Sequence, residues 1–488
     1  MNVLLLSNNA PNYHFFFNSL AQLLLNDGAH VVAAVDSTFS RDKNRLDEVG
    51  FTAVHDFSTH FSNHEFNPEI VAKFSDFPLN AALLSDFERA QIYDLWGADA
   101  DIAFFDRLKS ALLSFFEVLF DRYQIDLVLY EGVSNSFAHY ALFVAQMKQK
   151  TYCGLAGSRL PGRFEIVADP LADKRVESTF LAIRNGEREV QPDARAWVQD
   201  YLQRIETISP DYMKINGLDR LSIARRYFRR DRIKQVAKLL RHGRTDRTAY
   251  YLVGNPLRTH IRLFGRNAKR RLRSSRVRKL YQEPRSDEKF LLYPLHFHPE
   301  ASTSILSGTY LDEYEVIRNI AFNLPEGVRL YVKDHVSAWA YPSVDFYRRI
   351  RKLPNVRLLA PEQPTKQLIK QSVGVITLTS TVGYEALLLG RQVFLYGSVF
   401  YQFHCGVTAI ENPARLRDLL CDGVANPPSW SDQYTADFVA AYYLSTLEGT
   451  LNLMQSADEA ERSAQEVYSK LRLIWPGQAA RTFGDIGS

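Results

Sequence analysis

Two histidines and a glutamate follow an apolar segment in the second half of the chain. Residues 290–293 are apolar throughout and predict a buried strand, and His296, His298 and Glu300 come soon after it. Hydroxyl residues that could cap a helix come next. Because polar side chains at strand ends commonly bind ligands, this segment predicts a functional site rather than core.

A second junction of strand, loop and helix begins about 80 residues later, after the apolar residues 375–378. Its polar or small residues are Thr379, Ser380, Thr381, Gly383 and Glu385. Backbone N–H groups and hydroxyls at a helix N-terminus bind anions, and we expect Gly383 to let the chain approach a ligand closely. Two such junctions in one α/β unit predict a phosphorylated, nucleotide-bearing ligand at the carboxyl ends of parallel strands.

A nucleotide leaving group needs hydrogen-bond donors and positive charge where negative charge builds up. His298 and Lys333, which ends the expected strand 328–333, supply both beside Ser380 and Thr381. Other interpretations stay open for each residue. His298 could cap a turn, Lys333 could be a surface lysine, and Ser380 could simply cap its helix.

The first half of the chain offers carboxylates for chemistry at a sugar. Glu131 directly follows the expected strand 126–130, so it is our candidate for the general base or nucleophile, although helix capping would also explain it. A reaction that retains configuration needs a second carboxylate, for which Asp169 is a candidate. Arg159 and Arg163 could grip a sugar carboxylate by bidentate pairing.

The 488 residues alternate between expected strands and helices in two separate regions, which exceeds what a single core usually accommodates. We therefore predict an α/β protein with two Rossmann-like domains. The predicted segments are an N-terminal domain at 1–170, a basic and mostly helical insertion at 171–285 and a nucleotide-sugar-binding domain at 286–430. C-terminal helices at 431–488 are predicted to pack back on the first domain.

Positive charge is concentrated in one segment. Residues 220–279 contain 21 lysines and arginines and two acids, a net charge of +19, whereas the whole chain carries +4. Interspersed aromatic and aliphatic residues suggest amphipathic helices on anionic lipid. A solvated insertion or a nucleic-acid footprint would also carry such charge. Since no RNA- or DNA-binding motif accompanies it, we expect a membrane surface and no nucleic acid.

Three cysteines without metal-ligand spacing predict a reducing compartment and no structural zinc. Neither a signal peptide nor a membrane span is apparent, so we expect a cytoplasmic protein.

The two Rossmann-like halves and their polar elements resemble the GT-B glycosyltransferases of bacterial capsule polysaccharide synthesis, of the β-Kdo transferase type, which use CMP-activated ulosonic acids. The resemblance rests on His298-Pro299-Glu300, Val332-Lys333-Asp334-His335, Thr379-Ser380-Thr381, Gly383, Glu385 and Glu131-Gly132. It is strongest over about 286–400 and weaker over 125–170. His335 departs from the pattern, because Val336 stands where these enzymes have proline.

The resemblance implies a GT-B fold with two domains facing across a cleft, and transfer of a Kdo-like sugar from its CMP donor to a lipid-linked or oligosaccharide acceptor. It implies no cofactor and no metal, and a place on the inner face of the cytoplasmic membrane. The expected catalytic residues are Glu131, His298 and Asp169. The expected nucleotide-sugar ligands are His296, Glu300, Lys333, His335, Thr379, Ser380, Thr381, Gly383, Glu385, Arg159 and Arg163.

Two other functions fit the same residues. One is transfer from a UDP-sugar or a CDP-polyol on the same fold. The other is a non-catalytic scaffold that binds glycan or lipid through its basic surface.

Overall fold

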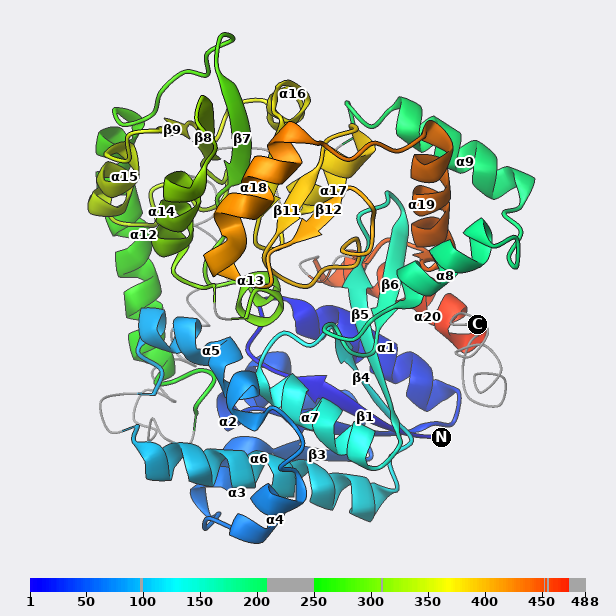
Figure 1. The fold of residues 1–488 in the computed structure, drawn as a ribbon. Coiled ribbons are helices and arrows are strands. Elements are labelled where there is room, and N and C mark those ends of the chain that lie inside the picture. Colours follow the sequence, from blue (N-terminus) through cyan, green and yellow to red (C-terminus); the bar gives the residue numbers. More distant parts are fainter. Residues whose placement is uncertain (97–99, 209–249, 309, 452, 454–455, 474–488) are drawn as a thin grey trace. The chain divides into compact units, whose positions relative to one another are not determined.

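The computed structural model describes residues 1–96, 100–208, 250–308, 310–451, 453 and 456–473. The described chain forms two compact units, each with its own sheet (Figure 1). Unit 1 takes residues 1–170, 250–264 and 447–473 of it, and unit 2 takes 171–208 and 265–446.

Unit 1 is built on a seven-stranded sheet with the order β13-β6-β5-β4-β1-β2-β3. The strands are β1 (Asn2–Ser7), β2 (His30–Val35), β3 (Ala53–Asp56), β4 (Leu127–Glu131), β5 (Thr151–Gly157), β6 (Arg163–Val167) and β13 (Leu447–Glu448). The five strands from β3 to β5 are parallel, whereas at one edge β6 pairs antiparallel with β5 and β13 pairs antiparallel with β6. The inner strands are almost wholly apolar because helices cover parallel sheets on both faces.

The helices of unit 1 are α1 (Tyr13–Asn26), α2 (Thr38–Asn44), α3 (Phe57–Ser62), α4 (Pro68–Lys73), α5 (Leu79–Tyr93), α6 (Ile102–Tyr123), α7 (Ser136–Met147) and α20 (Ala457–Leu473), with a 3₁₀ turn at Leu46–Glu48. Short polar side chains start several of them: Asp101 accepts from the Phe104 N–H at α6, and Asn135 accepts from the Ala138 N–H at α7. Helix α20 packs along α1 within this unit (Figure 1).

Unit 2 is built on six parallel strands with the order β12-β11-β10-β7-β8-β9. They are β7 (Lys289–Pro294), β8 (Val328–Lys333), β9 (Val356–Leu359), β10 (Gly374–Thr377), β11 (Val393–Leu395) and β12 (Val407–Ala409). The chain order reverses between β7 and β10, so their exit loops diverge from one point. Ligands of doubly wound sheets bind in the crevice at such a point.

The helices of unit 2 are α8 (Arg175–Arg184), α9 (Pro192–Gln203), α13 (Ala301–Leu306), α14 (Glu313–Asn323), α15 (Val344–Arg351), α16 (Thr365–Gln371), α17 (Thr381–Leu388), α18 (Leu416–Ala425) and α19 (Asp432–Leu444), with a 3₁₀ turn at Pro413–Arg415. Helix α12 (Pro256–Arg278) begins among the residues of unit 1 and ends among those of unit 2.

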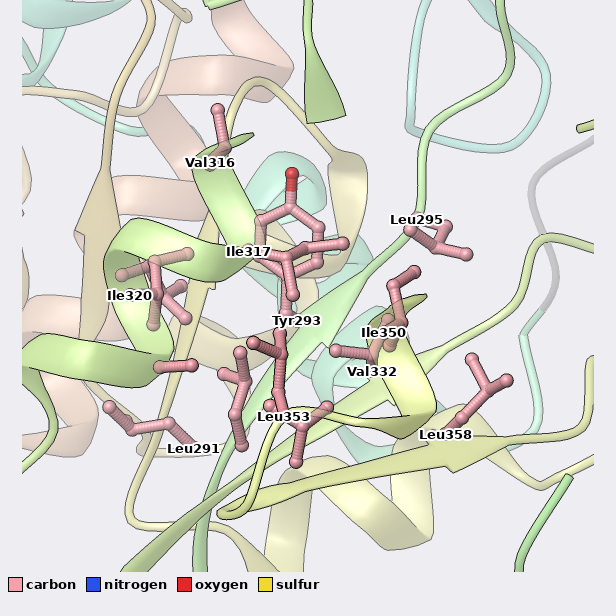
Figure 2. Close-up of a cluster of buried hydrophobic side chains, with 14 of the residues drawn as sticks. Leu291, Tyr293, Leu295, Val316, Ile317, Ile320, Val332, Ile350, Leu353 and Leu358 are labelled. Carbon is pink, nitrogen blue, oxygen red and sulfur yellow. The ribbon is translucent and has the colours of Figure 1, made fainter. Parts of the chain in front are cut away.

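One apolar core of unit 2 lies beneath the loop that follows β7. Figure 2 shows Leu291 and Tyr293 of β7 packed with Ile317 and Ile320 of α14 and with Ile350 of α15. All five side chains are completely buried. This core fixes β7 and α14 relative to each other, and both contribute polar groups to the site described below.

The expected fold class, an α/β protein with two Rossmann-like domains, is confirmed. The structure adds strands that we did not predict, β3, β6, β12 and β13, all at or near sheet edges, where half-exposed residues give a weak apolar signal. In the predicted insertion, α8, α9 and α12 are helical, and 209–249 lie outside the described residues. The predicted tail divides, with α19 in unit 2 and α20 in unit 1. A cleft between the domains stays a prediction.

Among the described residues, no helix combines the length and the apolar composition that crossing a membrane requires.

Candidate functional site

His296 joins the two diverging loops of unit 2. Its ring Nε2 lies 3.4 Å from the backbone N of Thr379 and 3.2 Å from Thr377 Oγ1, at the end of β10. Its Nδ1 lies 2.9 Å from Glu313 Oε1. Because the Thr379 N–H donates to Nε2, the hydrogen-bond network assigns the ring proton to Nδ1, which donates to the carboxylate. Both ring nitrogens therefore bind protein groups, and His296 acts as a brace between β7, β10 and α14.

Glu313 is the buried centre of this junction. Its Oε1 also accepts a hydrogen bond of 2.7 Å from the His296 backbone N–H, and its Oε2 lies 3.5 Å from Nε2 of His298. Burial alone would raise the pKa of Glu313, but hydrogen bonds from the two histidines outweigh it and lower the pKa to about 2. The carboxylate is therefore ionised at neutral pH and orders both histidines.

His298 is more exposed than His296, with 17% of its side chain accessible. The Arg266 guanidinium of α12 donates a 2.8 Å hydrogen bond to the His298 carbonyl, so the loop is held from a second side. Glu300 stands two residues later, directly before α13. His298 is thus the less buried ring of this pair, although both of its ring nitrogens are buried, and Glu313 sets its orientation.

Lys333 ends β8, the neighbour of β7, and is nearly buried. Its ammonium donates to the Pro361 carbonyl at 3.1 Å. Burial lowers the pKa of Lys333 to about 8, against the opposing effect of Asp334, Glu362 and Glu385. The side chain is therefore charged at neutral pH, in a setting where a phosphate would replace lost hydration.

Of the two residues after Lys333, Asp334 is buried and His335 is half-buried. Asp334 accepts from the Tyr281 hydroxyl at 2.5 Å and from the His335 N–H at 2.7 Å, and burial raises its pKa to about 6. His335 Nδ1 accepts from the Ser337 N–H at 3.2 Å, and burial with nearby Lys333 lowers the pKa of His335 to about 4. His335 is therefore neutral, with its proton assigned to Nε2. Asp334 fixes the loop, and His335 can offer a neutral donor.

The second junction forms the start of α17. Ser380 is the N-cap residue, and its Oγ accepts from the Val382 N–H at 3.2 Å. Thr379 precedes it and Thr381 opens the helix. Ser380 therefore caps the helix. Capping is compatible with anion binding, because a helix N-terminus carries partial positive charge.

Gly383 has a different explanation from the one its sequence suggested. A Cβ at this position would lie 2.4 Å from Oη and 3.0 Å from Cζ of Tyr401. The buried Tyr401 hydroxyl donates a 2.6 Å hydrogen bond to the Ser380 carbonyl. The close approach that requires glycine is therefore made by Tyr401, which supports the first turn of α17, and not by a ligand.

Glu385 lies on the same helix, with an oxygen 3.9 Å from the Lys366 ammonium. Burial lowers the pKa of Lys333, and the negative charge of Glu385 opposes this shift. The structure thus gathers His296, His298, Lys333, the Thr379–Thr381 loop and Glu385 at the carboxyl edge of one sheet.

Unit 1 places Glu131 at the end of β4, beside the point where its own strand order reverses. The Ser134 hydroxyl donates to Oε1 at 2.5 Å. Burial raises the pKa of Glu131, although hydrogen bonds from Ser134 and Tyr13 oppose the shift. A carboxyl group with a raised pKa at a strand end suits general acid–base work.

Asp169 is not brought near Glu131. Strand β6 runs antiparallel to β5, with Val167 opposite Gly154 and Phe164 opposite Gly157, so the chain returns toward the amino edge of the parallel sheet before it reaches Asp169. There Gln146, at the end of α7, donates to the Asp169 carboxylate at 3.2 Å. The sheet thus separates Glu131 from Asp169, the candidate second carboxylate of a retaining reaction.

Arg159 and Arg163 flank the turn between β5 and β6, at the carboxyl edge that also bears Glu131. Arg163 opens β6 and is opposite Glu448 of β13 in the sheet register. A sugar carboxylate as their ligand stays a prediction.

Two functional candidates were missed from the sequence. Glu313 stands in the first turn of α14, where acidic residues are common, so nothing in its spacing points to the histidines. Asp36 directly follows β2 and is buried, and burial raises its pKa to about 7. An acid at the end of a wholly apolar strand was the signal for Asp36.

The described residues contain no group of three or more His, Cys, Asp or Glu side chains that could hold a metal ion.

Residues 209–422 match the family model of capsule polysaccharide biosynthesis proteins. This range contains all six strands of unit 2. This part of the chain therefore resembles capsule polysaccharide biosynthesis proteins, as its motifs indicated. None of the curated proteins matches it.

Several solved structures are similar in fold. The β-Kdo 2,7 transferase of KpsC from Thermosulfurimonas dismutans is 15% identical to this chain. The match covers 72% of this chain and 88% of that one, with a TM-score of 0.33. The β-Kdo 2,4 transferase of the same KpsC is 14% identical, with 69% and 87% covered and a TM-score of 0.36. UDP-GlcNAc 2-epimerase of Neisseria meningitidis is 11% identical, with 96% and 100% covered and a TM-score of 0.30. At these values none of the likenesses assigns a residue or a substrate to this chain.

The first prediction concerns Glu313→Gln. The lowered pKa of Glu313 means that its carboxylate stabilises the fold above the unfolded pKa of about 4.5 and that this contribution is lost as pH falls toward 2. We expect the variant to lose about 1.5–3 kcal/mol of unfolding free energy at pH 7, the usual range for hydrogen bonds to a buried charge. The deficit should shrink progressively below pH 4.5. Denaturant unfolding at pH 7 and pH 3.5 measures both values.

Glu315→Gln is the matched control, because Glu315 lies two residues away on α14 and pairs with Arg318 on the surface. We expect a change within about 0.5 kcal/mol there. Equal effects of the two substitutions would contradict the role given to Glu313.

The second prediction concerns Gly383→Ala. Its Cβ would displace Tyr401, so we expect a loss of about 1–3 kcal/mol of unfolding free energy without any ligand. Adding Tyr401→Phe removes the closest atom, and the double variant should lose less than the sum of the single ones. A Gly383→Ala protein of normal stability that binds nucleotide poorly would instead restore the ligand interpretation.

Proposed function

We propose that this protein is a glycosyltransferase of capsule polysaccharide synthesis that moves a CMP-activated ulosonic acid, such as Kdo, onto a glycan acceptor. The observation that carries the proposal is the junction of Glu313 with His296 and His298 at the strand-order reversal of unit 2. Doubly wound sheets bind nucleotides at this point, and the matched capsule-synthesis region includes it.

In the proposed reaction, the bond between the anomeric carbon and the CMP phosphate breaks, and negative charge grows on the phosphate. His298 donates a hydrogen bond to it, Lys333 supplies positive charge, and the N-terminal turn of α17 adds aligned N–H groups. Glu385 is assigned to the ribose, and Glu300 and His335 to the same nucleotide. Preorganisation by Glu313 matters because donors that are already oriented need not reorganise as the charge develops.

Glu131 is the proposed carboxylate that activates the acceptor hydroxyl or attacks the anomeric carbon. Its raised pKa makes it a stronger base than an exposed glutamate. Arg159 and Arg163 are proposed to bind the carboxylate of the ulosonic acid. Asp169 lies toward the other edge of the sheet, whereas Asp36, which directly follows β2, is a buried acid at the same carboxyl edge as Glu131.

The same chemistry would serve a UDP-sugar or CDP-polyol donor, and a scaffold would bind glycan without turnover. The CMP donor is preferred because its single phosphate matches one histidine and one lysine and needs no metal clamp for a diphosphate.

We also propose that the protein works at the inner face of the cytoplasmic membrane, next to lipid-linked or oligosaccharide acceptors. The basic segment 220–279 supports this location, since each lysine or arginine near an anionic surface contributes about 1 kcal/mol. Residues 220–249 of this segment lie outside the described residues.

The third prediction tests the nucleotide. We expect CMP to raise the melting temperature of the wild type, because a ligand that binds only the folded state stabilises it, and UMP or UDP to raise it less. His298→Ala should reduce the CMP-induced shift and lower turnover of a CMP-ulosonate by about 100-fold or more. Thermal unfolding and initial rates measure the two effects.

His30→Ala is the control, because His30 is exposed on unit 1. It should leave both measurements unchanged. Stabilisation by UDP but not CMP would favour a UDP-sugar donor, and stabilisation without turnover on any donor would favour the scaffold.

The fourth prediction concerns pH. Because burial lowers the pKa of Lys333 to about 8, its positive charge is present below this pH and is lost above it. The affinity for CMP should be nearly constant from pH 7 to 8 and then weaken by up to about tenfold per pH unit. Lys333→Met should bind CMP more weakly throughout, with no break near pH 8. Calorimetric titration between pH 7 and 9.5 compares the two, and a break that survives in the variant would rule out Lys333 as its cause.

A further inference from the structure

Helix α12 combines a dense positive charge with exposed apolar side chains. Residues 256–279 contain ten lysines and arginines and no acid. The helix runs for 23 residues from Pro256 to Arg278. Four of the twelve large apolar side chains that are exposed in the described part of the chain belong to it. Such a helix needs an explanation for both its charge and its apolar surface.

One face of α12 is fixed to unit 2. The Arg270 guanidinium donates to the Trp339 carbonyl at 2.8 Å, and Arg273 donates to the Tyr341 carbonyl at 3.2 Å. Arg270 also lies over the Tyr341 ring, 4.3 Å from its centroid. Val277 is completely buried in the core of unit 2. These contacts set the rotation of the helix about its axis, so its other face is defined.

The opposite face carries an apolar stripe, defined here as Ile261, Phe264, Ala268 and Leu272. The spacing of three, four and four residues places the four side chains on one side of an α-helix. The three large ones are 61%, 70% and 76% exposed, in chain order.

Basic side chains flank the stripe on both sides. Arg258, Lys269 and Arg276 lie toward one side of it and Arg271 toward the other, by the 100° rotation per residue of an α-helix. All four are exposed. An apolar stripe between two basic borders is the pattern of a helix that lies in the plane of a membrane interface.

We propose that this face of α12 inserts into an anionic lipid surface, with Phe264 and Leu272 among the acyl chains and the flanking arginines and lysine at the phosphate groups. The proposal deepens the membrane location proposed above and does not depend on the identity of the donor sugar. Charge complementarity identifies the partner, because ten basic residues without an acid favour an anionic surface. A nucleic acid would use the charge but would leave the apolar stripe in water.

The orientation has a consequence for the site. Arg266, on the face fixed to unit 2, donates to the carbonyl of His298 at 2.8 Å. One helix therefore presents the lipid-binding stripe on one side and holds the proposed nucleotide loop on the other. Acceptors embedded in the same membrane would be supplied next to the enzyme that uses them.

The test compares two double variants in sedimentation with vesicles of phosphatidylglycerol and phosphatidylcholine. Phe264→Ser with Leu272→Ser removes the stripe. Leu181→Ser with Phe322→Ser is the matched control, since these side chains are 51% and 68% exposed on helices α8 and α14. We expect the stripe variant to bind about tenfold more weakly or worse, from the apolar area no longer buried, and the control to bind like the wild type.

A direct readout of insertion is the fluorescence of the Phe264→Trp variant. The emission of its new indole should shift to shorter wavelength on anionic vesicles and should be quenched by brominated acyl chains, because the indole enters the hydrocarbon boundary. Raising the salt concentration should weaken binding without abolishing it, since screening acts on the charges and not on the apolar contact.

The proposal is overturned if the stripe variant sediments like the wild type, if the emission of the Phe264→Trp variant does not change on vesicles, or if the protein binds nucleic acid but not vesicles. Stabilisation by CMP is measured on the same variants. Normal CMP stabilisation with lost vesicle binding supports the proposal, whereas vesicle binding that survives without any response to CMP contradicts the donor assignment and leaves the lipid surface standing.

Discussion

The site of unit 2 depends on one buried carboxylate. Glu313 accepts from the backbone and the ring of His296 and lies 3.5 Å from the ring of His298, so a single side chain of α14 orders the loop after β7. His296 then passes this order to the loop after β10 through Thr377 and Thr379. A buried charge is costly unless it is fully hydrogen-bonded, and here the bonds from the histidines outweigh the effect of burial on its pKa.

This arrangement explains why the polar residues of the two junctions differ in role. His296, Ser380 and Asp334 bind protein groups and hold the loops, whereas His298 and Lys333 are the residues that we propose for the ligand. The apolar core shared by β7 and α14 makes the geometry rigid, because a packed interior resists small displacements. Helix α12 extends the same construction to the surface, since Arg266 holds the His298 loop and the stripe faces away.

The sequence predicted the strands whose positions follow from the local pattern of apolar residues. Strand β8 has the bounds that its apolar residues indicated, and β4, β7 and β10 begin and end within one residue of theirs. It did not predict contacts between distant residues: nothing local links Glu313 to the histidines of the preceding loop. The direction of β6 was equally hidden, so the sequence did not show that the sheet separates Asp169 from Glu131. The need for glycine at 383 was correct, but the neighbour that imposes it, Tyr401, is 18 positions away in the chain.

We propose that the reversal point of unit 2 binds CMP through His298 while His296 acts as a brace. Histidine-selective NMR tests it most directly, with ¹⁵N-labelled rings assigned by single substitutions and followed during a CMP titration. We predict that the ring resonances of His298 move with increasing CMP, that those of His296 stay nearly fixed because protein groups hold both of its ring nitrogens, and that UMP produces smaller changes. Resonances of His298 that stay fixed at saturating CMP, or that respond equally to UMP, would contradict it.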